Sequence, residues 1–148
     1  MKPVSEIEDP KVAAFARQAE RFLADFRWCR RVIEAEVAWA AAGLLGVFRV
    51  RIDPAREDID EVVWVVTGDL PPAYLAYDPR ETWQDALRSY VGEMQRWVEA
   101  AKAGKTVSRV IAVNVAPTPE NAGRLESRLV FIRTHLLEVP AESLESDA

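Results

Sequence analysis

The sequence predicts an α+β fold, in which a small antiparallel sheet is covered by amphipathic helices and a long helical segment lies at the N-terminal end. Three observations carry this prediction. A helix start is encoded at Asp9 and Pro10, two segments within residues 46–67 have the pattern of strands, and an apolar stripe of helical spacing follows Thr82. The two strand-like segments make a β-hairpin, with a third strand as an open alternative.

The first predicted helix begins at Pro10. Asp9 is a favourable N-cap residue, and proline is well tolerated at the first helical position, where its missing N–H makes no difference. Apolar residues then recur every three or four positions at Val12, Phe15, Ala19, Phe22 and Phe26. Residues 28–42 are ambiguous, because they alternate as a strand would but are rich in alanine. Alanine content favours helix there, and strand stays the alternative.

Residues 46–52 alternate apolar residues with Arg49 and Arg51, as a half-buried strand does. Residues 61–67, EVVWVVT, form a β-branched and aromatic run typical of a more buried strand. The polar link between them predicts a hairpin with a long loop. Pro71 and Pro72 cannot donate to a ladder, so the sheet is expected to end there.

The next helix is predicted to start at Asp78 and Pro79, or alternatively at Thr82, and to end at Gly104. Its apolar stripe comprises Trp83, Leu87, Tyr90, Met94, Trp97 and Ala101. Gly92 interrupts this helix, and close packing by another helix is the expected reason. Residues 107–113 are a third strand or a buried extended segment, and a last helix runs from Thr118 and Pro119 to near Pro140.

A chain of 148 residues fits a single domain. We expect a flexible N-terminus over residues 1–8, one α+β domain over residues 9–139 and a disordered acidic tail over residues 140–148. The net charge of −5, with acidic and basic residues intermixed, argues against nucleic acid as a partner. The longest uncharged stretch is too short to cross a membrane, and no secretory signal is visible, so we expect a cytoplasmic protein without a membrane partner.

Catalytic and metal-binding side chains are scarce. Cys29 is the only cysteine and His135 the only histidine, which excludes an internal disulfide, a cysteine-based zinc site and a multi-histidine metal site. The acidic residues around the hairpin loop lack the spacing of an EF-hand, so a solvated loop is expected. The sequence therefore predicts neither a cofactor nor a metal site.

The stretch WVVTGDLPPAYL, a following helix with the pattern WxxALxxYVxEMxxWVxA, and PTPENAGRLESRLVFI resemble an uncharacterised family of small bacterial proteins. The resemblance covers about residues 45–138. It implies a bacterial, intracellular protein, and it assigns no activity and no catalytic residue.

Apolar faces are plentiful and the usual catalytic groups are nearly absent, which favours a non-enzymatic module that binds a protein or a small ligand, with a homodimer as one form of that interaction. The expected ligand-binding residues are Asp69, Tyr74, Trp83 and Tyr90, because a stiff loop after the second strand precedes an aromatic helix. The alternative is a small enzyme that uses Asp69 and Tyr74 as acid and base. A purely structural interpretation is equally open, in which Asp69 stabilises the turn and the aromatic residues Tyr74, Trp83 and Tyr90 pack in the core.

Overall fold

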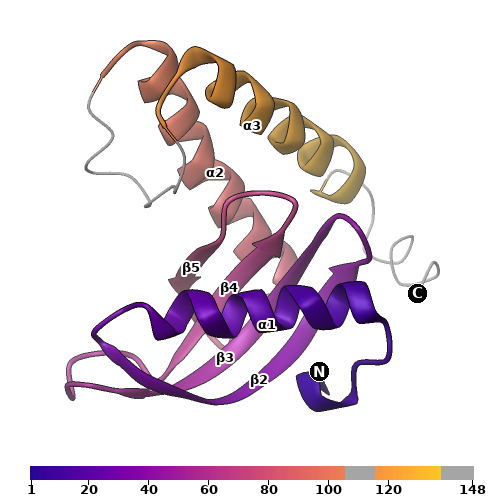
Figure 1. Cartoon of the computed structure of the whole chain (residues 1–148), viewed down its shortest axis with the longest axis vertical. Helices are drawn as coiled ribbons and strands as arrows, with labels where there is room; N and C mark the ends of the chain where they lie inside the picture. The colour runs from indigo at the N-terminus through magenta and orange to yellow at the C-terminus, as the bar shows by residue number, and fades with distance from the viewer. Residues whose placement is uncertain (106–115, 138–148) are drawn as a thin grey trace. The chain divides into compact units, whose positions relative to one another are not determined.

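The computed structural model describes residues 1–105 and 116–137, and it confirms the α+β class (Figure 1). The chain divides into two compact units, Met1–Leu87 and Arg88–Ala148. The first unit holds a five-stranded antiparallel sheet in which each strand pairs with its sequence neighbour. The strands are β1 (Lys2–Pro3), β2 (Cys29–Ala41), β3 (Leu45–Pro54), β4 (Val62–Gly68) and β5 (Ala73–Ala76).

The hairpin predicted over residues 46–67 is confirmed as the antiparallel pair of β3 and β4. As expected, Phe48, Val50 and Ile52 are buried. Arg49 and Arg51, between them, are half-buried and exposed respectively. The face of β3 that carries Phe48, Val50 and Ile52 therefore packs into the hydrophobic core, as predicted.

The preference for helix over residues 28–42 is wrong, because Cys29–Ala41 is a strand paired along its length with β3. Three register shifts interrupt this pairing, between Cys29 and Arg31, Val32 and Glu34, and Val37 and Trp39. Each irregularity of this kind adds a residue to one strand of the pair, and the strand continues beyond it. Pairing with β3 outweighs the helix preference of the alanines.

The expectation that the sheet ends at Pro71 and Pro72 is also wrong. Both prolines precede β5, which adds to β4 through residue pairs from Val63 with Ala76 to Val66 with Ala73. Because the prolines stand before the first paired residue, their missing N–H groups remove nothing from the ladder. β5 is the last strand in the sheet order, and this leaves it at an edge.

The first helix, α1 (Pro10–Ala24), begins as predicted, with the Asp9 carboxylate accepting from the Lys11 amide at 2.8 Å. It lies across one face of the sheet (Figure 1), where Ala16, Ala19 and Leu23 join the buried core. The helical segment is shorter than expected and ends before Phe26. Residues 1–8, predicted to be flexible, contain β1, which pairs with β2, and a 3₁₀ helix (Val4–Glu6).

The remaining helices are α2 (Trp83–Lys102), α3 (Pro119–Ile132) and the π-helical turn η2 (Arg133–Leu137). Thr82, not Asp78, starts α2: Thr82 Oγ1 accepts from the Asp85 amide at 3.3 Å while Asp85 accepts from the Thr82 amide at 2.9 Å. Thr118 caps α3 as expected. No described helix is long and apolar enough to span a bilayer. The predicted strand at residues 107–113, the helix end near Pro140 and the acidic tail lie outside the described residues.

Candidate functional site

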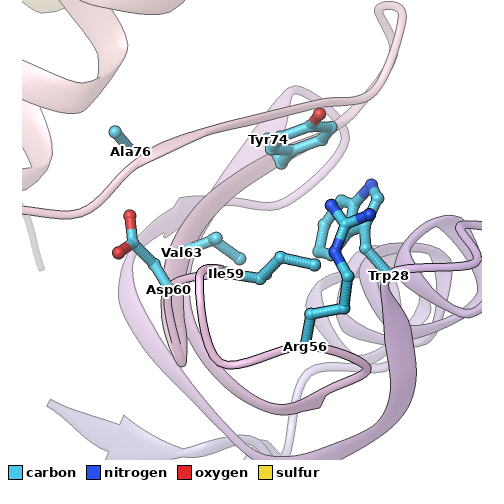
Figure 2. Close-up of a pocket in the computed structure, with 7 residues that line it drawn as sticks. All are labelled: Trp28, Arg56, Ile59, Asp60, Val63, Tyr74 and Ala76. Atoms are coloured by element: carbon cyan, nitrogen blue, oxygen red, sulfur yellow. The ribbon is translucent and has the colours of Figure 1, made fainter.

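A pocket of about 260 Å³ opens beside the edge strand β5 (Figure 2). Its lining combines aromatic, aliphatic and charged side chains from separate parts of the first unit: Trp28, Arg56, Ile59, Asp60, Val63, Tyr74 and Ala76. An apolar hollow with a few polar groups at its margin is the usual form of a small-molecule site.

Sheet pairing brings the strand residues of the pocket together. Val63 on β4 lies opposite Ala76 on β5, and its neighbour Val65 lies opposite Tyr74. Side chains two residues apart on a strand share a face, so Tyr74 and Ala76 both project to the face that carries Val63. That is the face covered by α1, because Val63 and Val65 belong to the same core as Leu23 of α1.

Tyr74 is held at the centre of an aromatic cluster formed with Phe22, Phe26 and Trp28. Its ring centroid lies 4.9 Å from that of Trp28 and 5.2 Å from that of Phe26, and Phe26 and Trp28 stack on each other at 5.0 Å. Ring pairs at these separations attract each other beyond the area they bury. The Tyr74 ring is therefore fixed in place although 38% of the residue is exposed.

The charged groups of the pocket come from the loop between β3 and β4. Arg56 Nε lies 3.2 Å from Asp58, with both side chains more than two thirds exposed. A pair so exposed to water is weak, so a bound anion can compete for the guanidinium. Asp60 is exposed as well, and in Figure 2 it lies toward Ala76, whereas Arg56 lies toward Trp28.

Of the four residues expected to bind a ligand, Tyr74 lines this pocket and the other three do not. Asp69 is exposed, and its amide donates to the Leu44 carbonyl at 2.9 Å. Trp83 stacks on Trp39 with ring centroids 4.6 Å apart and planes 9° apart. Tyr90 is fully buried in the second unit, where burial raises the pKa of its phenol.

Sequence reasoning missed Trp28, Arg56 and Asp60 as pocket residues. Trp28 falls at the start of the segment for which helix was favoured, and Asp60 falls in the acidic loop that was expected to be solvated. A correct strand assignment for residues 29–41 would have placed Trp28 next to that loop, because the Ala55 amide donates to the Trp28 carbonyl at 2.8 Å.

The rare residues Cys29 and His135 are not among the residues that line this pocket. Burial and the nearby carboxylate of Asp53 raise the pKa of the Cys29 thiol, which therefore stays protonated at neutral pH. The ring of His135 packs on Phe131, with centroids 4.5 Å apart. Within residues 1–105 and 116–137, no group of three or more histidine, cysteine or acidic side chains is placed to hold a metal ion.

The opposite face of the sheet carries a half-buried ion pair. Arg49 on β3 bonds to Glu36 on β2 and donates to the Tyr77 hydroxyl at 3.3 Å. Both hydrogen bonds raise the pKa of Arg49, so its guanidinium group stays positively charged. The arginine links β2 to the residue that follows β5, and these contacts give it a structural role.

No family model matches the sequence. Neither a curated protein nor a solved structure matches it. The resemblance to a family of small bacterial proteins therefore stays a prediction.

Proposed function

We propose that this chain is a non-enzymatic ligand-binding module of the bacterial cytoplasm, and that its pocket beside β5 takes a small, flat aromatic molecule with an anionic substituent. The observation that carries the proposal is the Tyr74 ring, which is held 4.9 Å from Trp28 while it lines an open pocket. A fixed, exposed ring offers a stacking surface without an ordering cost on binding.

The pocket's lining suggests what the ligand contains. Val63 and Ile59 supply an apolar wall, which favours a hydrocarbon or aromatic body. Arg56 supplies a planar cation that pairs well with a carboxylate. A volume of about 260 Å³ suits a one-ring or two-ring molecule. Asp60 adds an acceptor for a hydrogen-bond donor on the ligand.

Geometry supports binding over the enzymatic alternative. That alternative used Asp69 and Tyr74 together, yet the pocket lined by Tyr74 does not include Asp69. A general acid and base must both reach the reacting group within hydrogen-bond distance. The carboxylate that does line the pocket is that of Asp60, which is exposed to solvent.

A titration with indole-3-acetate, with indole as the uncharged comparison, tests this proposal. Isothermal calorimetry or ligand-observed NMR should show binding of the acid that Arg56→Gln weakens about tenfold, equivalent to about 1.4 kcal/mol. The matched control is Arg80→Gln, because Arg80 also pairs with an aspartate two residues away, at 2.7 Å, and lies outside the pocket.

Three outcomes would contradict the proposal. One is the absence of binding by either compound at millimolar concentration. The others are an equal loss of affinity in both arginine variants, and binding whose NMR shifts leave Trp28 and Tyr74 unaffected.

A second candidate function is self-association, which the edge position of β5 favours. No described strand pairs with the outer edge of β5, and two copies of an edge strand can pair antiparallel about a twofold axis. Native mass spectrometry should then show a dimer. Hydrogen exchange at the β5 amides should slow as protein concentration rises, and a monomeric mass with concentration-independent exchange would count against it.

A further inference from the structure

The two edges of the sheet differ in their protection against pairing with another chain. At one edge, β1 consists of Lys2 and Pro3 alone, and its neighbour β2 pairs onward with register shifts. Very short strands, lysine, proline and bulges are the usual devices that keep a sheet edge from pairing. At the other edge, β5 has the uncharged sequence AYLA and pairs with β4 in unbroken register. β5 is therefore the edge better suited to take a further strand.

A second copy of the same strand suits this edge. Residues 73–77, AYLAY, contain neither a charge nor a proline, so two copies do not repel each other and every residue keeps its N–H. Tyr74 and Ala76 are exposed, so an added strand covers apolar side chains. A charged partner would find no opposite charge in this stretch to pair with.

Twofold symmetry restricts how the two copies pair. When identical edges pair antiparallel about a twofold axis, the axis stands perpendicular to the sheet, so α1 covers the same face in both copies. Residues directly opposite each other in an antiparallel pair have neighbouring side chains on one face. Because successive residues of a strand alternate in face, Tyr74 lies opposite a residue an even number of positions away, such as Ala76 or Tyr74 itself.

Pairing centred on Leu75 makes the best use of the strand. It sets Leu75 opposite its own copy and Tyr74 opposite the partner's Ala76, and residues 73–77 all take part without a proline. Pairing centred on Tyr74 would set two tyrosine rings against each other and place Pro72, which has no N–H, opposite Ala76. A large ring opposite a small alanine is the complementary arrangement.

This register brings a residue of the second copy to the pocket beside β5. Ala76 and Tyr74 both line that pocket (Figure 2). Directly opposite Cβ atoms in an antiparallel pair are about 4.5–5.5 Å apart, so the partner's Tyr74 lies next to Ala76, on the face where the pocket opens. The symmetry repeats the contact, and each copy supplies its tyrosine to the pocket of the other.

We propose that the pocket beside β5 is completed by a second copy of this chain, whose Tyr74 contacts the bound ligand across the strand pair. This inference rests on the proposed function, since it takes the same pocket and the same aromatic anion. The paired stretch is short, so the dimer without ligand is weak, and a ligand that touches both copies adds contact between them. Ligand binding and dimerisation therefore strengthen each other by the same factor.

Sedimentation velocity of the full chain, with and without indole-3-acetate, measures this coupling. Saturating ligand should tighten the dimer by about tenfold or more, and the affinity for the ligand should rise with protein concentration. A second measurement locates the contact. In a mixture of isotope-labelled and unlabelled chains at saturating ligand, a filtered NOE experiment should place the Tyr74 ring of one copy next to the Ala76 methyl group of the other.

Leu75→Lys separates the contact between copies from the pocket, because Leu75 does not line the pocket and faces its own copy in the dimer. Like charges directly opposite each other destabilise a strand pair. We expect a monomer that binds indole-3-acetate about tenfold more weakly, at every protein concentration. The matched control is Ile33→Lys, which changes an exposed residue of β2 outside this pocket and should keep both the dimer and the affinity.

The shared pocket is overturned, and the proposed function left intact, if indole-3-acetate binds a chain that stays monomeric with one affinity at every protein concentration. The same holds if no NOE joins Tyr74 and Ala76 of different copies, or if Leu75→Lys binds the ligand as tightly as the unmodified chain. Absence of binding at every protein concentration would overturn the proposed function and the shared pocket together. The sedimentation and NOE experiments use the unmodified chain, so they decide the question even if Leu75→Lys fails to fold.

Discussion

The hydroxyl of Thr67 on β4 donates a hydrogen bond of 2.7 Å to the carbonyl oxygen of Phe15 in α1. Thr67 is the one fully buried polar residue among the described part of the chain. The bond fixes the position of α1 along the sheet, because apolar contacts alone are not directional. Through α1 it also positions Phe22, a member of the aromatic cluster around Tyr74.

Thr67→Val should therefore reduce the free energy of unfolding by about 1 kcal/mol, the usual net contribution of a neutral hydrogen bond. Valine keeps the shape and volume of threonine, so the loss reports the hydroxyl and not a cavity. Urea denaturation followed by circular dichroism measures the change. Thr67→Ser, which keeps the hydroxyl, serves as the comparison, and an unchanged urea midpoint in Thr67→Val would show that the bond contributes nothing.

Gly68, at the end of β4, should tolerate no side chain. Its φ of +141° is rarely adopted by other residues, and a Cβ atom there would lie 2.5 Å from the Leu44 carbonyl oxygen and 2.6 Å from the Leu45 Cα. Both contacts are with backbone, which cannot move aside cheaply.

Gly68→Ala is expected to destabilise the protein by about 3 kcal/mol or more, from strain and steric overlap combined. Gly43→Ala isolates the strain, because Gly43 has a φ of +79° but open space around its Cβ, and it should cost about 1 kcal/mol. Melting temperatures of the two variants give the comparison. Equal losses would mean that the overlap at Gly68 is relieved by local movement.

Sequence patterns predicted the elements whose local signals agree with one another. Asp9 and Thr118 each cap a helix, and in both cases a proline follows at the first helical position, so two local signals predict the same helix start. The alternation around Phe48 likewise corresponds to a strand that pairs with β4 without a register shift. The β2 strand was missed because its alanine content favours helix, although its apolar residues alternate and it pairs along its length with β3. β5 was missed because it has only four residues and follows two prolines.

The pocket was predicted in part, since Tyr74 was expected to bind and does line it, whereas its partners were not foreseen. Tyr74 meets Trp28 only because β2, β3, β4 and β5 pair in order. Phe22 of α1 and Phe26, which follows α1, reach the same edge of the sheet. Those contacts join residues far apart in the sequence. Proximity along the chain suggested Trp83 instead, which stacks on Trp39.

Cys29 should make stability depend on pH in the alkaline range. Burial and Asp53 raise the pKa of its thiol above the ordinary value of 9.0, so the unfolded chain releases this proton at a lower pH than the folded chain. The protonated Cys29 thiol therefore adds to the free energy of unfolding. This stabilisation is complete below pH about 9 and is lost as the pH rises toward the raised pKa.

Urea denaturation at pH 7 and pH 9.5 should show a larger alkaline loss of stability for the unmodified chain than for Cys29→Ala. The difference between the two proteins removes the effect of lysine and tyrosine titration, because both retain those residues. Identical losses would mean that the thiol pKa is the same in the folded and unfolded chains.

Trp97 provides the test of the buried stripe of α2. Trp97 is 1% exposed, and it lies on the same helix face as Tyr90 and Met94, which are fully buried. Trp97→Ala removes a fully buried indole ring from that stripe and leaves a cavity, so the free energy of unfolding should fall by about 3–5 kcal/mol. Trp97→Phe keeps a ring in the same place and should cost clearly less. Chemical denaturation of both variants, followed by far-ultraviolet circular dichroism, orders them. If Trp97→Ala unfolds at the same urea concentration as the unmodified chain, the residue contributes no packing energy, and the stripe would have to be reinterpreted as a surface that the protein uses for contact.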